Sequence, residues 1–274
     1  MAANSGLRRL VKRSLYRGGG LPYRAVQSLS MAADIRRGTW SEPELSLIHH
    51  AVRPGETVVD VGANYGLWTY HLSKAVGSGG RVLAFEPVPS TAAVLKWVVG
   101  LLRLKNVELR AAACGVSGGQ IDMVLPVQDA GPPSAGQAHF ADRSDDRPGH
   151  ESHVRWTRSR TVKVDVVALD EAVRHKEVTF IKCDVEGAEP MVLQGAAVTL
   201  GRSRPTLVVE INPWFLEGFG STTEQLLVLL SSHGYQGYRL DDRAGRLVPI
   251  GDQLKEDNYV FVHPSRLARL EPLL

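Results

Sequence analysis

A glycine-containing turn at the end of an apolar strand constrains this chain more than any other feature. Val58 and Val59 lead into the segment Asp60–Gly66, whose sequence is DVGANYG. Gly62 and Gly66 lack Cβ atoms, so the backbone can turn tightly there and approach a ligand closely. Backbone N–H groups that open the following helix face whatever binds at such a turn. The segment therefore predicts a ligand site where a buried strand passes into a helix.

The glycine spacing separates two classes of ligand. A dinucleotide-binding turn has glycines at relative positions 1, 3 and 6, with the pyrophosphate at the helix N-terminus. Here Asn64 stands between Gly62 and Gly66, and Leu67 occupies the place of the third glycine. The carboxylate of Asp60 would repel a pyrophosphate, but it suits a ligand with an ammonium group and a sulfonium centre. The turn therefore favours S-adenosylmethionine (SAM) over NAD.

A second acid follows the next apolar strand. Residues 81–85 are followed by Glu86 and Pro87, and Glu86 lies 24 residues after Gly62. An acid at this point can accept hydrogen bonds from both ribose hydroxyls of a nucleoside ligand. NAD would need the same acid, so Glu86 does not discriminate between the two cofactors. The alternative without function is a glycine turn in an ordinary βαβ unit, which the acids at two successive strand ends disfavour.

Three segments together resemble the FkbM family of SAM-dependent methyltransferases: Asp60–Asn64 (DVGAN), Phe85–Pro87 (FEP) and Ile181–Glu189 (IKCDVEGAE). The resemblance extends from about Glu56 to His263, and the third segment is its most specific part. It implies SAM as the cofactor and methyl transfer as the reaction. Characterised members of the family are mostly O-methyltransferases that act on hydroxyls of sugars, glycolipids or polyketides. The resemblance implies family membership but not the substrate, and O-methylation of such a hydroxyl is the leading hypothesis.

The turn, the second strand end and the resemblance together give a set of expected cofactor-binding positions. They are Asp60, Gly62, Ala63, Asn64, Gly66, Glu86, Pro87, Ala113, Cys114 and Asp184. Ala113 and Cys114 stand beside the expected adenine, where family members often have an acidic residue. We therefore expect backbone groups and apolar packing to hold the adenine. Members also often carry asparagines on the helix after Pro87, where this chain has Val98 and Leu102.

Strand-like and helix-like segments alternate from Glu56 onward, which is typical of a parallel sheet covered by helices on both faces. We predict an α/β fold with a Rossmann-like, doubly wound sheet of seven strands. The resemblance implies the strand order 3-2-1-4-5-7-6, with strand 7 antiparallel. The predicted strands are Thr57–Val61, Arg81–Phe85, Val107–Ala112, Thr179–Cys183, Thr206–Ile211, Gly234–Leu240 and Asn258–His263. The predicted helices are about Leu67–Ala75, Pro89–Leu102, Pro190–Leu200 and Thr223–Ser232.

Residues 118–160 interrupt this alternation. The segment is rich in proline, glycine and aspartate, which is too polar for a core. We predict a strand pair, Gln120–Val124 with Thr161–Val167, and a long loop between its strands. Loops of that length are usually functional or disordered. Two interpretations of this segment remain: a lid that faces the substrate, or an insertion that never contacts it.

The N-terminal segment carries the positive charge of the chain. Six basic residues and no acid lie in residues 1–33, so the rest carries 26 basic and 29 acidic residues, a balance of −3. We predict a basic helical extension over residues 1–53 and a methyltransferase domain over 54–274. Leu7, Leu10, Val11 and Leu15 have helical spacing, and Ser41 is the expected N-cap of a helix to Val52. The extension is a packed or partly ordered arm, or a helix that contacts a membrane surface.

Composition limits which other classes of protein this chain can belong to. A chain of 274 residues, 43% hydrophobic and 22% charged, can bury one substantial core. No apolar run is long enough to span a bilayer, and no signal peptide is recognisable. Cys114 and Cys183 lie in strand-like segments without zinc spacing, which predicts reduced core thiols and favours the cytoplasm. Because the body of the chain is slightly acidic, no nucleic-acid channel is expected.

Acids at the strand ends supply the candidate catalytic groups. SAM brings a good leaving group, so an O-methyltransferase mainly aligns the acceptor hydroxyl and removes its proton. Asp184 and Glu186 are the first candidates for the base, and Glu210 is the second. Asp184 could instead bind the amino group of SAM. Lys182, two residues earlier on the same face, could pair with one of these acids.

Further candidates are weaker. His139, His150 and His153 lie in the insertion, where they could reach the site or remain solvated. A magnesium ion on Asp184 and Glu210 has no supporting ligand spacing, so no metal is predicted. An NAD-dependent oxidoreductase and a catalytically silent SAM-binding scaffold remain as alternative functions. The acceptor is expected to be a small molecule or a glycolipid, and the sequence does not give the oligomeric state.

Overall fold

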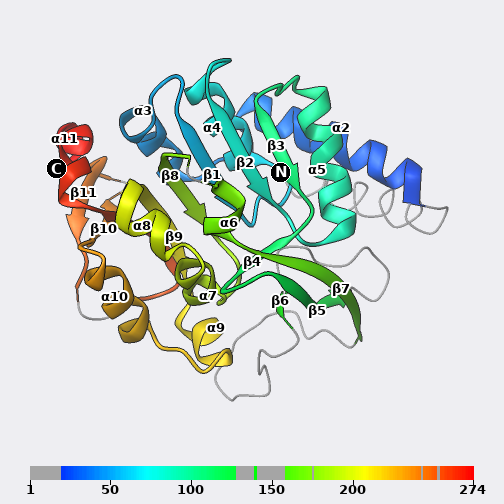
Figure 1. Cartoon of the computed structure of the whole chain (residues 1–274). Helices are drawn as coiled ribbons and strands as arrows, with labels where there is room; N and C mark the ends of the chain where they lie inside the picture. Colours follow the sequence, from blue (N-terminus) through cyan, green and yellow to red (C-terminus); the bar gives the residue numbers. More distant parts are fainter. Residues whose placement is uncertain (1–19, 128–138, 141–157, 175, 242, 252–253) are drawn as a thin grey trace.

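The computed structural model of the chain describes residues 20–127, 139–140, 158–174, 176–241, 243–251 and 254–274 (Figure 1). Its main sheet has eight strands in the order β11-β10-β12-β9-β8-β1-β2-β3. Their bounds are β1 Thr57–Val61, β2 Arg81–Phe85, β3 Val107–Arg110, β8 Val178–Cys183, β9 Thr206–Ile211, β10 Gln236–Asp241, β11 Arg246–Pro249 and β12 Asp257–Val262.

The predicted strand order is confirmed, but the predicted strand number is wrong. The strands β3-β2-β1-β8-β9-β12-β10 form the order 3-2-1-4-5-7-6, and β12 runs antiparallel to β9. The eighth strand, β11, is a four-residue hairpin partner of β10 at the edge of the sheet. Its sequence, RLVP, is too short for an alternation of apolar and polar residues to mark it.

Helices cover both faces of this sheet, as the doubly wound prediction requires. Successive strand residues alternate between two apolar clusters: Val58 packs with α2–α5 on one face, and Val59 packs with α6–α8 and α10 on the other. The helices are α2 Gly20–Arg37, α3 Ile48–Ala51, α4 Leu67–Val76, α5 Pro89–Leu101, α6 Leu169–Val173, α7 Glu189–Gln194, α8 Ala197–Ser203, α9 Pro213–Gly218, α10 Thr223–Ser232 and α11 Leu267–Leu270. Three 3₁₀ helices are η1 Pro43–Leu47, η3 Pro264–Arg266 and η4 Glu271–Leu273.

A second, four-stranded sheet projects beside the first (Figure 1). It has the order β4-β7-β5-β6, with bounds β4 Ala113–Gly115, β5 Gly119–Val127, β6 His139–Phe140 and β7 Arg158–Ala168. The predicted strand pair is β5 with β7, and both strands are longer than expected. The third predicted strand of the main sheet stops at Arg110, because the chain then joins β7 in this second sheet. The centre of the insertion, 128–138 and 141–157, lies outside the described residues.

The N-terminal segment differs from its prediction in two respects. An 18-residue helix, α2, begins at Gly20 and packs along α5, where Ser28 Oγ donates to the carbonyl oxygen of Val94 at 3.4 Å. The predicted helix from Ser41 to Val52 is only η1 followed by α3, and Ser41 does not cap it. Glu42 precedes η1 without a capping side-chain hydrogen bond, because Pro43 already fixes the first turn. The predicted helix over residues 7–15 lies outside the described residues.

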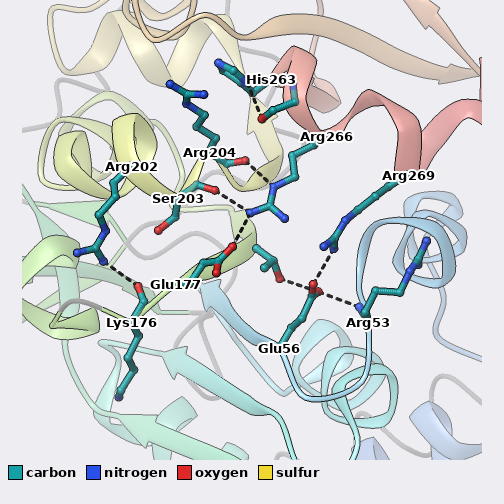
Figure 2. A network of polar contacts seen from close by, with 12 residues as sticks. Arg53, Glu56, Lys176, Glu177, Arg202, Ser203, Arg204, His263, Arg266 and Arg269 are labelled. Atoms are coloured by element: carbon teal, nitrogen blue, oxygen red, sulfur yellow. Dashed lines mark hydrogen bonds and ion pairs between the residues drawn. The ribbon is translucent and has the colours of Figure 1, made fainter.

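The C-terminal segment is held against the main sheet by two arginines (Figure 2). Arg266 donates to Glu177 at 3.1 Å and to the Ser203 carbonyl oxygen at 2.8 Å. Arg269 pairs with Glu56 at 2.7 Å, and the Glu56 carboxylate also accepts from Thr179 Oγ1 at 2.8 Å. The network therefore links the start of β1 and β8 to η3 and α11.

Replacing Glu56 tests whether this network stabilises the fold. We expect Glu56→Gln to lower the free energy of unfolding by about 1.5–3 kcal/mol, since it weakens hydrogen bonds to a charged, mostly buried group. Asp122→Asn is the matched control, because Asp122 pairs with Lys163 at the surface, where both side chains are more than half exposed. Its cost should stay below about 1 kcal/mol. Equal losses in urea denaturation of the two variants would contradict the assigned role.

Candidate active site

Four acids gather where four neighbouring strands end. Asp60 lies in β1, Glu86 directly follows β2, Asp184 directly follows β8, and Glu210 lies in β9. These strands are adjacent in the order β9-β8-β1-β2. The carboxyl ends of parallel strands meet at one edge of the sheet, which is where open α/β sheets bind ligands. The structure therefore brings together the four acids that the sequence singled out.

The glycine turn contacts the loop after β8 backbone to backbone. Gly62 has φ +80°, and a Cβ added there would lie 1.8 Å from the carbonyl oxygen of Asp184. Asp184 N in turn donates to the Val61 carbonyl oxygen at 3.1 Å. Gly66 also has positive φ, and a Cβ there would press on Leu95. Glycine is therefore required at both predicted positions, and at Gly62 the reason is its contact with Asp184.

Glu86 shapes the turn as well as facing the expected ribose. It is buried, and its carboxylate accepts hydrogen bonds from Asn64 N and Val88 N, both at 2.9 Å. Burial raises the pKa of Glu86 to about 7. Asn64 has φ 47°, and its buried Oδ1 has no hydrogen-bond partner among the described residues. A buried acceptor without a partner costs free energy, so a donor on a ligand would compensate it.

Asp60 is also buried, with Thr69 Oγ1 donating to its Oδ2 at 2.5 Å. Burial raises the pKa of this carboxyl to about 6. Ala63, beside it, is buried against Ala84 and Leu95. Pro87 is half-buried directly after Glu86. These positions border the turn as expected.

Lys182 is the cation at the centre of the acids. Its side chain is 1% exposed, and its Nζ lies 2.7 Å from Asn258 Oδ1 and 3.4 Å from Asp184 Oδ2. The ammonium also lies 5.6 Å from the Trp68 ring centroid, within cation–π range. Burial lowers the pKa of Lys182, but the charges of Asp184 and Glu210 outweigh burial, so its pKa is raised overall. The expected pairing of Lys182 with Asp184 is confirmed.

Glu210 and Asp184 form a hydrogen-bonded carboxyl pair. Burial, followed by the charge of Asp184 and this hydrogen bond, holds the pKa of Glu210 well above its ordinary value. In its protonated form Glu210 donates to Asp184. The Asp184 side chain is 36% exposed, so a ligand can reach it. Two carboxyl groups with divided roles are a common basis for proton transfer in active sites.

The loop after Asp184 is held by a buried acid to which the sequence analysis gave no role. Glu189 is fully buried, and its Oε1 accepts from Val185 N at 3.0 Å and from Gly187 N at 3.2 Å. Burial raises the pKa of Glu189 to about 7. Glu186, a predicted catalytic candidate, has φ 58°, and its negative charge contributes to the raised pKa of Glu210. Glu189 lies within the recognised motif, but its spacing does not specify the backbone hydrogen bonds that it accepts.

Two further acids come from the segment before β1. Glu42 Oε2 accepts from Trp68 Nε1 at 2.7 Å, and its charge acts on Lys182. Glu44 is buried, and burial raises its pKa; its Oε2 has no hydrogen-bond partner among the described residues. No sequence signal marked these residues, because they lie before the recognisable motifs.

The remaining predicted positions are apolar residues and histidines outside the four strand ends. Ala113 and Cys114 lie in β4 and are buried in separate apolar clusters, where burial raises the pKa of the Cys114 thiol. Both cysteines are buried and free of disulfides, as predicted. His139 lies in β6, while His150 and His153 lie outside the described residues. Within the described ranges, no group of three His, Cys, Asp or Glu side chains is arranged to hold a metal ion.

Known proteins resemble the chain over most of this fold. The family model described as "Methyltransferase FkbM domain" matches residues 60–236. Ribosomal RNA large subunit methyltransferase E of Sorangium cellulosum is 32% identical over 26% of this chain and 36% of its own length. Methyltransferase 1 of Beauveria bassiana is 27% identical over 50% of this chain and 57% of its own length. The chain therefore spans well under two thirds of either relative. A crystal structure of methyltransferase FkbM from Methylobacillus flagellatus KT matches with TM-score 0.46 and 17% identity, over 81% of this chain and 50% of that chain.

The family match covers more than half of the chain and contains all four strand-end acids. The chain belongs to the FkbM methyltransferase family. SAM is the cofactor of this class of domain, which agrees with the cofactor predicted from the glycine spacing.

The buried acids predict how stability depends on pH. Asp60, Glu86 and Glu189 have folded-state pKa values above those of an unfolded chain, so the folded state binds more protons. The contribution of these three acids to the free energy of unfolding should therefore be highest below the unfolded value of 4.5 for a glutamate. It should fall as pH rises toward the folded value of about 7. We expect the melting temperature to drop by several degrees between these limits, at about 2–4 °C per kcal/mol.

Glu86→Gln should reduce this pH dependence, because it removes one of the three titrating groups and keeps the side-chain shape. Differential scanning calorimetry of both proteins across the window checks the result. If the melting temperature changes with pH by the same amount in both proteins, Glu86 does not contribute to the pH dependence.

The contact of Gly62 with Asp184 gives a steric prediction. Gly62→Ala should cost about 3 kcal/mol or more of stability, because it combines overpacking against backbone with a strained positive φ. Gly77→Ala is the matched control: Gly77 also has positive φ, +64°, but a Cβ there meets nothing within 4 Å. It should cost only about 1–2 kcal/mol. Urea denaturation that finds the two costs equal would show that Gly62 is not held against Asp184.

Proposed function

We propose that this protein is an O-methyltransferase that transfers the methyl group of SAM to a hydroxyl of a sugar, glycolipid or polyketide. The observation that carries the proposal is the carboxyl pair after β8 and in β9. Asp184 is partly exposed, hydrogen-bonded to the protonated Glu210 and 3.4 Å from Lys182. A carboxylate that faces solvent beside the glycine turn is suited to accept a proton from an acceptor hydroxyl.

The chain's own residues divide the work in this proposal. When bound, SAM supplies an electrophilic methyl group on a sulfonium leaving group. Asp184 accepts a hydrogen bond from the acceptor hydroxyl and takes its proton as the new carbon–oxygen bond forms. Glu210 and Lys182 hold Asp184 in place by hydrogen bond and charge. Glu186, which lies in the same loop, remains a second candidate for contact with the acceptor.

The cofactor positions follow from the same geometry. Glu86 accepts from the ribose hydroxyls with the lone pairs that Asn64 N and Val88 N leave free. Asp60 faces the positively charged methionine end of SAM, where a cation lowers the cost of its burial. Ala113 and Cys114 remain proposed neighbours of the adenine, through the backbone of β4. The alternative role of Asp184, binding of the SAM amino group, predicts a different experimental result.

Asp184→Asn separates these roles. If Asp184 is the base, the rate of methyl transfer should fall by about 10²–10⁴-fold while the SAM dissociation constant changes little. If Asp184 binds the amino group, SAM affinity should fall first. Isothermal titration calorimetry gives the affinity. S-adenosylhomocysteine release, in a mass-spectrometric screen of sugar, glycolipid and polyketide extracts, gives the rate.

Two controls make the result interpretable. Asp122→Asn removes an exposed carboxylate that pairs with Lys163 at the surface, and it should change neither quantity. Titration of the wild type with NAD tests the oxidoreductase alternative. Binding of NAD without binding of SAM would overturn the proposal. SAM binding with no product in any extract would favour the silent scaffold.

A further inference from the structure

The outer surface of α2 and α5 exposes an unusual number of large apolar side chains. Nine large apolar residues of the described part are exposed, and five of them lie on these two helices. On α2 they are Leu21, Val26 and Leu29, at 66%, 39% and 58% exposure; on α5 they are Trp97 and Leu101, at 42% and 45%. Scattered exposed leucines are normal, but a group on two packed helices indicates an interaction surface.

The two helices form one continuous surface. Ser28 on α2 hydrogen-bonds to Val94 on α5, and Figure 1 shows α2 running along the α5 side of the molecule. Val26 and Leu29 are three residues apart, so they lie on the same side of α2. The opposite side of the helix packs inward through Ser28 and Ile35. The outward apolar residues therefore have no internal packing role.

Basic side chains border this surface at the end of α2. A cavity of about 570 Å³ is lined by Arg36, Lys74, Leu101 and Arg103, among others. It shares Lys74 and Arg103 with a second cavity of about 810 Å³, which also contains Lys105. None of these four cations forms an ion pair with another described residue, and Lys74 lies over the Tyr70 ring at 5.5 Å. Arg81 is different, because Glu108 neutralises it.

We propose that this surface docks on an anionic lipid bilayer. Exposed apolar side chains beside unpaired cations are the combination that binds a negatively charged membrane interface. The apolar residues enter the boundary between headgroups and acyl chains, while Arg36, Lys74, Arg103 and Lys105 contact lipid phosphates. We name the residues Val26, Leu29, Trp97 and Leu101, together with these four cations, the α2–α5 surface.

Charge distinguishes the bilayer from other occupants of the surface. Residues 1–19 carry Arg8, Arg9, Lys12, Arg13 and Arg17 and no acid, so like charges oppose their folding onto it. The same repulsion opposes a second copy of this chain placed face to face. RNA would contact the cations but gain nothing from Val26 and Leu29. The basic N-terminal residues instead add to the attraction for an anionic membrane.

The position of α2 relates the surface to the cofactor site. Its first turn lines a cavity of about 460 Å³ through Tyr23 and Arg24, together with Tyr65 and Pro89. Tyr65 belongs to the glycine turn, and Pro89 follows Glu86 by three residues. The helix extends about 20 Å, at 1.5 Å per residue, from Tyr23 at this cavity to the basic end at Arg36. A membrane on the α2–α5 surface would thus lie beside the rim of the cofactor site.

Vesicle sedimentation tests the proposal with the full-length protein. We expect binding to vesicles of phosphatidylcholine and phosphatidylserine, weakening with salt, and little binding to phosphatidylcholine alone. Lys74→Gln/Lys105→Gln should lower the partition coefficient about fivefold for each charge removed, the ratio equivalent to about 1 kcal/mol. Val26→Glu/Leu29→Glu should abolish sedimentation, because it places carboxylates where apolar contact is needed.

Matched variants on other surfaces control for charge and folding. Val198→Glu/Val228→Glu adds the same charges at valines that are 63% and 66% exposed on α8 and α10. Lys255→Gln removes an exposed lysine near the opposite edge of the sheet. Both should sediment like the wild type. Calorimetric SAM binding by every variant verifies its fold, and because no step measures methyl transfer, failure here is distinguishable from failure of the proposed reaction.

Several results would overturn the docking proposal. One is a wild type that does not bind phosphatidylserine vesicles. Another is binding that survives both α2–α5 variants and disappears only when residues 2–19 are deleted, since the arm alone would then hold the membrane. An RNA that binds the wild type and loses affinity with Lys74→Gln/Lys105→Gln, but not with Val26→Glu/Leu29→Glu, would identify a nucleic-acid surface. A dimer in light scattering that Val26→Glu/Leu29→Glu converts to monomer would identify self-association.

Discussion

The ammonium group of Lys182 holds together a collection of carboxyl groups that would otherwise repel one another. Asp184, Glu210 and Glu42 all act on it, and it is buried against Trp68 and Asn258. A buried lysine and several buried acids are costly separately, and each compensates the other only when geometry and hydrogen bonds are good. One cation cannot neutralise all of these acids, so some stay protonated. Burial raises the pKa of Glu210, and Asp184 is the partly exposed member of the pair.

A second constraint comes from carboxylates that bind the protein's own backbone. Glu86 accepts from N–H groups on both sides of its strand end, and Glu189 accepts from two N–H groups of the loop after Asp184. Each acid fixes a loop whose glycine, Gly62 or Gly187, has positive φ. A Cβ on Gly187 would lie 2.6 Å from the Phe215 carbonyl oxygen, so this loop is as tightly packed as the first. Rigid loops would give Asp184 the fixed position that its proposed role toward an acceptor requires.

Local signals in the sequence predicted the position of the four acids, and the family resemblance implied the strand order. Apolar strands ended by an acid, and glycines at fixed spacing, are visible without tertiary information. What the sequence did not give depends on contacts between distant segments. The role of Glu42 requires knowing that its segment folds over Trp68, and β11 is a strand only because β10 offers an edge. Glu189 was within the recognised motif, but its function lies in backbone hydrogen bonds that spacing alone does not specify.

The segment before β1 links the cofactor site to the surface proposed to dock on a membrane. Its residues 42 and 44 bring acids to the cofactor end of the sheet, and α2, just before them, has one side packed on α5 and the other exposed. A methyltransferase acting on a lipid-linked hydroxyl must hold its cofactor rigidly and still approach an interface. Cofactor binding and membrane docking thus fall on neighbouring segments of the chain. Because α2 packs against the helices that cover the sheet, the distance from the membrane interface to Asp184 is fixed. None of the described helices combines the length and hydropathy needed to cross a bilayer. In this scheme α2 lies along the membrane surface, and Asp184 keeps a constant height above it.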